Sequence, residues 1–238
     1  MIQRPANRRR ILACVIPAMA VPLVASLVYF VLLAGSAAAT AVYATAKAFT
    51  VVWPIVAVFV IEGVRFKGKR PDWRKHFPAL PMGMATGLLI GGLIFGLYAL
   101  TPLGEYAREC ADDVRKKVTE MGLAGPARYV TFCILLAGLH SLIEEFFWRW
   151  YVFGRLVMVA PRGVAYFFAS LGFAGHHYVV LGCYFSAMGA FIFGTGVGIG
   201  GALWCWMYRR QGTLAGAWVS HALVDAAICY VGYQLIFA

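Results

Sequence analysis

Charged residues are scarce in this sequence, and acidic ones are the scarcest. Only 13% of the 238 residues are charged, whereas 62% are hydrophobic. A soluble domain averages about 25% charged and 45–50% apolar residues. The composition therefore excludes an ordinary soluble domain and indicates an integral membrane protein. Ten acidic residues stand against 21 basic ones, but the basic residues occupy short stretches between apolar runs, a pattern that orients helices in a bilayer. We therefore expect no nucleic-acid partner.

The spacing of the cysteines excludes the common metal motifs. The six cysteines form no CxxC pair and no zinc-finger spacing. We expect them to act as small apolar side chains within helices. Cys110 and Cys183 both fall on the expected outer side of the membrane, which leaves a disulfide between them open.

Apolar runs of about 20 residues predict an all-α, polytopic protein with about seven transmembrane helices. The predicted spans are 11–34, 40–62, 79–101, 128–158, 163–181, 184–207 and 213–237. The first run exceeds the roughly 7–15 residues of a signal-peptide core, so we interpret it as a retained helix. Residues 103–127 are the one substantial polar stretch, and we expect a short amphipathic helix at the surface.

The basic loops predict the orientation. If seven spans alternate, four basic clusters fall on one side, which the positive-inside rule assigns to the cytoplasm. These clusters are the N-terminal arginines, the 65–75 loop, the Arg155 and Arg162 region, and the Arg209–Arg210 pair. We therefore predict a cytoplasmic N-terminus. The short loops and the size of the chain suggest the plasma membrane of a prokaryote as the location.

Three short segments place ionisable side chains inside apolar runs. They contain Glu144, Glu145 and Arg149; His177; and His221 with Asp225. Such groups are costly within a bilayer unless they are paired or hydrated, so they are functional candidates by default. They supply the carboxylates and imidazoles that proton transfer or metal binding needs.

The spacing assigns different roles to the two adjacent glutamates. Glu145 and Arg149 are four residues apart on one helical face, which favours an ion pair. Glu144 projects about 100° away from Glu145, so its charge would not be answered by Arg149. We expect Glu145 and Arg149 to support the structure and Glu144 to be available as a general base.

Distances from the loops suggest that three helices bring these groups together. Glu144 lies about 17 residues before the expected turn at 160–162 and His177 about 15 residues after it, so both reach a similar depth. His221 and Asp225 share a face of the last span. We predict a buried site between the fourth, fifth and seventh spans. Of the neighbouring histidines, His140 is interpreted as structural, whereas a structural and a functional role both stay open for His176.

The three segments resemble the motifs of the CAAX protease and bacteriocin-processing family, also called Abi or CPBP proteins. That family has EExxxR, FxxxH, and HxxxN or a similar residue, on successive membrane helices. Here these are Glu144-Glu145 with Arg149, Phe173 with His177, and His221 with Asp225. Two positions depart from the usual pattern: Trp150 stands where many members have Gly, and Asp225 stands where Asn is common.

The resemblance implies an intramembrane endopeptidase and covers about residues 130–230. It implies that Glu144 activates water and that His177 and His221 assist. Asp225 must then orient His221, stay protonated or bind a metal, because an ionised carboxylate cannot donate a hydrogen bond to an oxyanion. The expected partners are membrane lipids and a hydrophobic, lipidated or membrane-embedded peptide. We accordingly divide the chain into residues 1–127, with about three spans and the polar segment, and residues 128–238, a catalytic helix bundle.

Alternatives remain at this stage. No cofactor is expected for a glutamate-type enzyme, but zinc is possible, because Glu144, His177, His221 and Asp225 would also suit a zinc-dependent hydrolase. A proton-coupled transporter also uses intramembrane Glu and His residues, although a relay would favour groups spread over different depths. A non-enzymatic immunity or sorting protein is a further alternative. The sequence identifies no substrate-binding residues.

Overall fold

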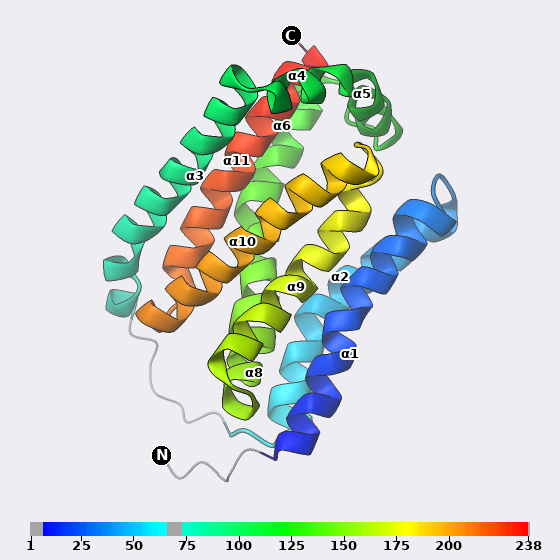
Figure 1. Cartoon of the computed structure of the whole chain (residues 1–238). Helices are drawn as coiled ribbons and strands as arrows, with labels where there is room; N and C mark the ends of the chain where they lie inside the picture. Colours follow the sequence, from blue (N-terminus) through cyan, green and yellow to red (C-terminus); the bar gives the residue numbers. More distant parts are fainter. Residues whose placement is uncertain (1–6, 66–72, 238) are drawn as a thin grey trace. The chain divides into compact units, whose positions relative to one another are not determined.

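A computed structural model describes residues 7–65 and 73–237 (Figure 1). The described residues are mainly helical and contain no strand, so the all-α prediction is confirmed. Within this part of the chain, seven helices are long and apolar enough to cross a membrane. They are Arg8–Leu32, Ala37–Ile61, Trp73–Leu100, Pro126–Val159, Arg162–Leu181, Ala187–Gln211 and Ala215–Phe237. Each coincides with a predicted span, and the protein is an integral membrane protein.

The chain divides into two compact units, each built from two stretches of sequence. The first unit comprises Met1–Trp73 and Ile143–Arg210, and the second comprises Arg74–Leu142 and Gln211–Ala238. The fourth span runs through the boundary at residue 142. The division into residues 1–127 and 128–238 stays a prediction.

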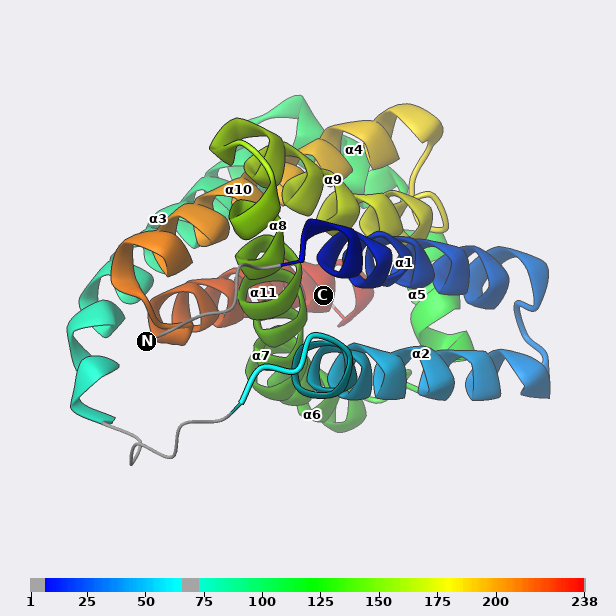
Figure 2. The same cartoon turned by 90° about the horizontal axis from the view of Figure 1, so that it is seen from below.

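The first unit packs its helices through small and aromatic residues. Its elements are α1 (Arg8–Leu27), η1 (Val28–Leu32), α2 (Ala37–Ile55), η2 (Val56–Ile61), η6 (Glu145–Phe153), α8 (Gly154–Val159), α9 (Arg162–Leu181) and α10 (Ala187–Gln211). Helices α1 and α2 lie side by side (Figures 1 and 2). Gly172 of α9 leaves room for Trp148 and Met19, because a Cβ there would lie 2.8 Å from the Trp148 ring. This close approach brings α9 against η6, which follows Glu144.

A partly buried ion pair joins the end of the second span to α8 in this unit. Glu62, which follows the second span, lies with a carboxylate oxygen 3.6 Å from Nε of Arg155 in α8. Burial raises the pKa of the Glu62 carboxyl above its usual range, and the Arg155 charge opposes this shift.

The second unit brings the last helix against the third span. Its elements are α3 (Leu80–Leu100), α4 (Pro102–Glu109), α5 (Ala111–Glu120), α6 (Pro126–Leu135), η5 (Leu136–His140) and α11 (Ala215–Phe237), and α7 (Ser141–Glu144) lies at the boundary. Helices α3 and α11 run side by side (Figure 1). Gly83, Gly87 and Gly91 of α3 face α11, where added Cβ atoms would meet Gly216, Leu223 and Ala227. Small residues therefore permit the close helix contact, as is usual within membranes.

Replacing Gly83 by valine is expected to destabilise the protein by about 1–3 kcal/mol, the usual effect of overpacking. A side chain at this position meets the backbone of Gly216, which cannot rotate away. Gly92→Val on the same helix is the matched control, since a Cβ at Gly92 has nothing within 4 Å. Thermal unfolding in detergent measures both variants. Equal losses of stability would show that the α3–α11 contact does not depend on the small residue.

The polar segment 103–127 forms two short helices, α4 and α5, where the sequence predicted one. Cys110 lies between them with a ψ of 3°. The Arg115 side chain of α5 donates hydrogen bonds to the carbonyl oxygens of Ile236 and Leu235, at 3.2 and 3.4 Å. Because the last carbonyls of a helix have no partner within it, Arg115 caps the end of α11.

Some sequence-based expectations lie outside the described residues. They are the contribution of Arg4 to the N-terminal cluster and that of residues 66–72 to the basic loop. All six cysteines are described and free, so the structure contains no disulfide between Cys110 and Cys183.

Candidate active site

Glu144 ends a single α-helical turn between two π-helical segments. These segments are η5 and η6, and the turn between them is α7. A π-helical turn closes i→i+5 hydrogen bonds, and such turns occur frequently at functional sites. The spacing of the motif residues predicted a regular α-helix here, so the local geometry of the fourth span differs from that expectation.

The expected ion pair between Glu145 and Arg149 is present. Arg149 Nε lies 3.2 Å from Glu145 Oε2, and both side chains have no exposed surface. A buried charge is tolerated when a close opposite charge compensates it. Glu145 is therefore committed to Arg149, as the spacing predicted.

Two aromatic rings complete the surroundings of Arg149. The guanidinium carbon lies 4.2 Å from the Phe173 ring centroid and 5.0 Å from that of Trp204, distances typical of cation–π contacts. Gly201 makes room for this arrangement, because a Cβ there would lie 3.0 Å from the Phe173 ring. Phe173 of the FxxxH segment is thus packed against the arginine of the EExxxR segment, and α10 supplies Trp204, which sequence reasoning missed.

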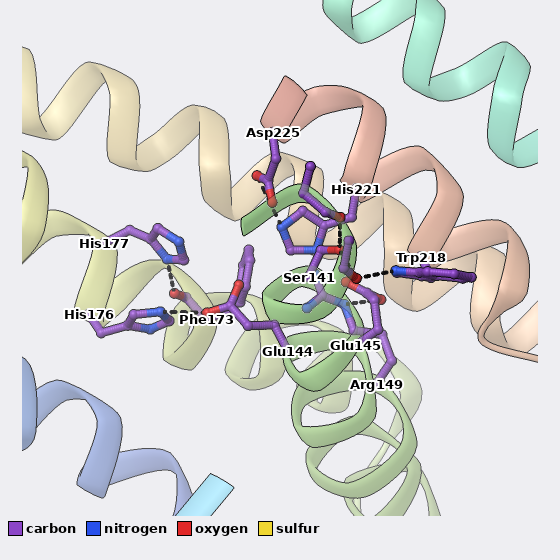
Figure 3. A network of polar contacts seen from close by, with 12 residues as sticks. Ser141, Glu144, Glu145, Arg149, Phe173, His176, His177, Trp218, His221 and Asp225 are labelled. Atoms are coloured by element: carbon purple, nitrogen blue, oxygen red, sulfur yellow. Dashed lines mark hydrogen bonds and ion pairs between the residues drawn. The ribbon is translucent and has the colours of Figure 1, made fainter. Parts of the chain in front are cut away.

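Glu144 contacts His176, a residue whose role the sequence left open. Glu144 Oε1 lies 3.3 Å from His176 Nε2 (Figure 3). Glu144 is only 6% exposed, so this contact is buried. The His176 ring stacks on Trp148, with 5.8 Å between ring centroids and 3° between ring planes. Trp148 thus fixes the plane of the imidazole beside Glu144.

His177 is held in one tautomer by its own helix. Its Nδ1 lies 2.8 Å from the Phe173 carbonyl oxygen (Figure 3). Because a carbonyl oxygen only accepts, Nδ1 donates the proton. In the neutral imidazole, Nε2 then carries a lone pair that can accept a hydrogen bond from water or bind a cation.

Glu144, His176 and His177 form one polar group. One carboxylate oxygen and one nitrogen from each imidazole all lie within 4.8 Å of one another. The structure therefore brings together two predicted site residues, Glu144 and His177, and adds His176. The adjacency of His176 to His177 was the available signal, but it did not reveal which imidazole meets the glutamate.

Helix α2 adds a cation close to this group. Lys47 and Tyr43 both interact electrostatically with Glu144, and the Lys47 ammonium lies 5.5 Å from the Tyr43 ring centroid. A lysine in the middle of a span needs such partners, because an isolated charge is costly there. The motif spacing did not predict this interaction of Lys47 with Glu144.

His221 and Asp225 form a second pair, on α11 in the second unit. His221 Nε2 lies 3.6 Å from Asp225 Oδ1, and His221 is only 4% exposed. In the same unit, the Trp218 indole donates a 2.9 Å hydrogen bond to the Gly138 carbonyl oxygen and ties α11 to η5 (Figure 3). Among the roles left open for Asp225, this contact fits the orientation of His221. The convergence of this pair with Glu144 and His177 stays a prediction.

The comparisons with known proteins agree with the motifs. Residues 126–227 match the family model described as Type II CAAX prenyl endopeptidase Rce1-like. This match spans all three motif segments. No curated protein and no solved structure matches the chain.

Together, the apolar helices and the family match define the class of the protein as an intramembrane endopeptidase. Residues 126–227 are similar to the Rce1-like CAAX prenyl endopeptidases, which agrees with the resemblance read from the sequence. The family implies a prenylated peptide substrate embedded in the membrane, and it gives no support to the transporter or non-enzymatic alternatives.

Proposed function

We propose that the chain is a glutamate-type intramembrane endopeptidase in which Glu144 activates water. The proposal is supported by the different partners of the two glutamates. Glu145 is sealed against Arg149 with no exposed surface, whereas Glu144 lies beside two imidazoles. Of the two adjacent glutamates, Glu144 is therefore the carboxylate that lies beside groups able to transfer protons.

The reaction follows from these groups. Glu144 takes a proton from water as the water oxygen attacks the peptide carbonyl carbon, and the tetrahedral intermediate forms. Glu144 then returns that proton to the amide nitrogen, the C–N bond breaks, and a carboxylic acid and an amine leave. His177, with its Nδ1 proton on the Phe173 carbonyl, offers Nε2 to hold the attacking water.

We assign His221 the stabilisation of charge that develops on the carbonyl oxygen, with Asp225 as its orienting partner. The 3.6 Å contact between the two side chains supports the second part of this assignment. A protonated imidazole donates to an oxyanion, which an ionised Asp225 cannot do.

A zinc-dependent hydrolase is the second candidate. One carboxylate and two imidazoles form the ligand set of several zinc peptidases, and Glu144, His176 and His177 supply such a set within 4.8 Å. The ligands predicted from the sequence were Glu144, His177, His221 and Asp225. We favour the metal-free mechanism, because Glu144 cannot act as a free base while it ligates a metal and Glu145 is committed to Arg149.

We propose that the substrate is a prenylated peptide. We also propose that the protein lies in a prokaryotic plasma membrane with its N-terminus in the cytoplasm. The contribution of the prenyl chain tests the substrate class. Each buried methylene contributes about 0.8 kcal/mol to membrane partitioning, so removing the prenyl group should lower kcat/KM by at least about 100-fold. The measurement compares one peptide with and without the prenyl group, using protein reconstituted in vesicles. Equal cleavage of both peptides would contradict a lipid-dependent substrate.

A further inference from the structure

We propose that Glu144, His176 and His177 form a site for a transition-metal ion, with zinc as the best fit, and that an ion bound there inhibits the peptidase. The site uses His176, which the reaction does not need. Its inhibitory part rests on the proposed role of Glu144 as the base, whereas metal binding itself is independent of that role.

The ligand geometry suits zinc. Zinc bonds of about 2.0–2.2 Å in a tetrahedral site place neighbouring ligand atoms about 3.3 Å apart. Glu144 Oε1 and His176 Nε2 are separated by 3.3 Å. A nitrogen of His177 completes the group within 4.8 Å of the other two ligand atoms. The fourth position would hold water.

The surroundings of His177 also favour a metal. Histidine ligands usually donate their second ring N–H to a carbonyl or a carboxylate, which fixes the tautomer. His177 makes this contact through Nδ1 to the Phe173 carbonyl oxygen at 2.8 Å. With the proton on Nδ1, Nε2 of the neutral ring carries a lone pair. This deprotonated nitrogen is the form that metal binding needs.

The surroundings of His176 favour reversible binding. Its Nδ1 is buried and has no hydrogen-bond partner in the described part of the chain. When Nε2 binds a metal, the proton on Nδ1 therefore lacks the acceptor that strengthens histidine ligands. The Trp148 ring holds the imidazole plane but supplies no acceptor. Such a site can gain and lose its ion with the available metal.

Inhibition is expected because the group contains one carboxylate, Glu144, which would have to serve both as zinc ligand and as base. A carboxylate bonded to zinc cannot take a proton from water, and a zinc peptidase would require a second carboxylate as base. The adjacent Glu145 is fixed by Arg149 at 3.2 Å with no exposed surface. An ion on Glu144 therefore removes the proposed base and supplies no substitute in this group.

The test titrates zinc into chelator-treated wild-type protein, His176→Gln and His76→Gln in detergent micelles. His76 lies in the second unit, where it contacts Thr213, so His76→Gln controls for the loss of a histidine elsewhere. Calorimetry measures binding, and each variant's peptidase activity is referred to its own metal-free rate. Losing one ligand of three should raise the zinc Kd by at least about 10-fold, with the inhibitory concentration rising in parallel, while His76→Gln matches the wild type.

Three results would overturn the proposal: no bound zinc in the wild type, equal zinc affinity in His176→Gln, or activation by zinc. Glu144→Gln separates this proposal from the catalytic one. Weakened zinc binding in that variant supports the metal site whatever its activity, whereas loss of cleavage under chelator bears on the base. Unchanged zinc binding in Glu144→Gln would remove the glutamate from the ligand set.

Discussion

Replacing Glu144 by glutamine is expected to lower kcat/KM for a prenylated peptide by about 10²–10⁴, the contribution of a positioned general base. The amide keeps the size of the side chain and its contact with His176, but it cannot accept a proton from water. The loss should therefore fall on kcat, with KM little changed. Steady-state kinetics of purified protein in vesicles measure both constants.

The matched control for this prediction is Glu120→Gln, which removes a carboxylate from α5 outside the spans. Glu120 pairs with Lys117 at 3.1 Å and is half exposed, so this variant should keep wild-type kinetics. Thermal unfolding of Glu144→Gln should remain close to that of the wild type, which separates chemistry from folding. A Glu144→Gln protein that cleaves at the wild-type rate would eliminate Glu144 as the base.

Replacing Arg149 by methionine is expected to destabilise the protein by about 3–5 kcal/mol, the usual consequence of removing one partner from a buried ion pair. The Glu145 carboxyl would remain without exposed surface and would lose the cation 3.2 Å away. The variant also loses the cation–π contacts with Phe173 and Trp204. Chemical unfolding in detergent micelles measures the loss.

Two further variants decide the cause of that loss. Arg128→Met removes an exposed arginine at the start of α6 and should have little effect. The double variant Glu145→Gln with Arg149→Met removes both charges and should recover a large part of the stability, because no uncompensated charge remains. A double variant as unstable as Arg149→Met alone would assign the loss to packing against the aromatic rings.

Hydropathy was sufficient to predict the spans. The last span was predicted at 213–237 and forms Ala215–Phe237, and the fifth was predicted at 163–181 and forms Arg162–Leu181. The predicted spans agree with the helices because every backbone polar group in a bilayer must be hydrogen-bonded within its own helix. Local spacing was also sufficient for the Glu145–Arg149 pair, since residues four apart on a helix are neighbours.

Contacts between distant segments could not be predicted from the sequence in the same way. His176 and His177 are adjacent in the sequence, and only packing decides that His176 meets Glu144. Trp204 carries no motif and joins Arg149 through the path of α10. The π-helical segment after Glu144 is likewise unpredicted, because apolar periodicity does not distinguish it from an α-helix over nine residues.

The polar segment shows what composition can and cannot predict. Its charges predicted a helix outside the spans, but not the break at Cys110 or the capping of α11 by Arg115. That cap depends on the end of a helix more than 100 residues away. It connects the segment with α11, which carries His221 and Asp225.

Cleavage of a prenylated peptide by metal-depleted wild-type protein tests directly whether a glutamate, without a metal, activates the water. The enzyme is treated with chelator, its zinc content is measured, and turnover is recorded before and after. We expect full turnover with no bound metal. Loss of cleavage on metal removal, with recovery on adding zinc, would contradict this expectation and assign the reaction to a metal.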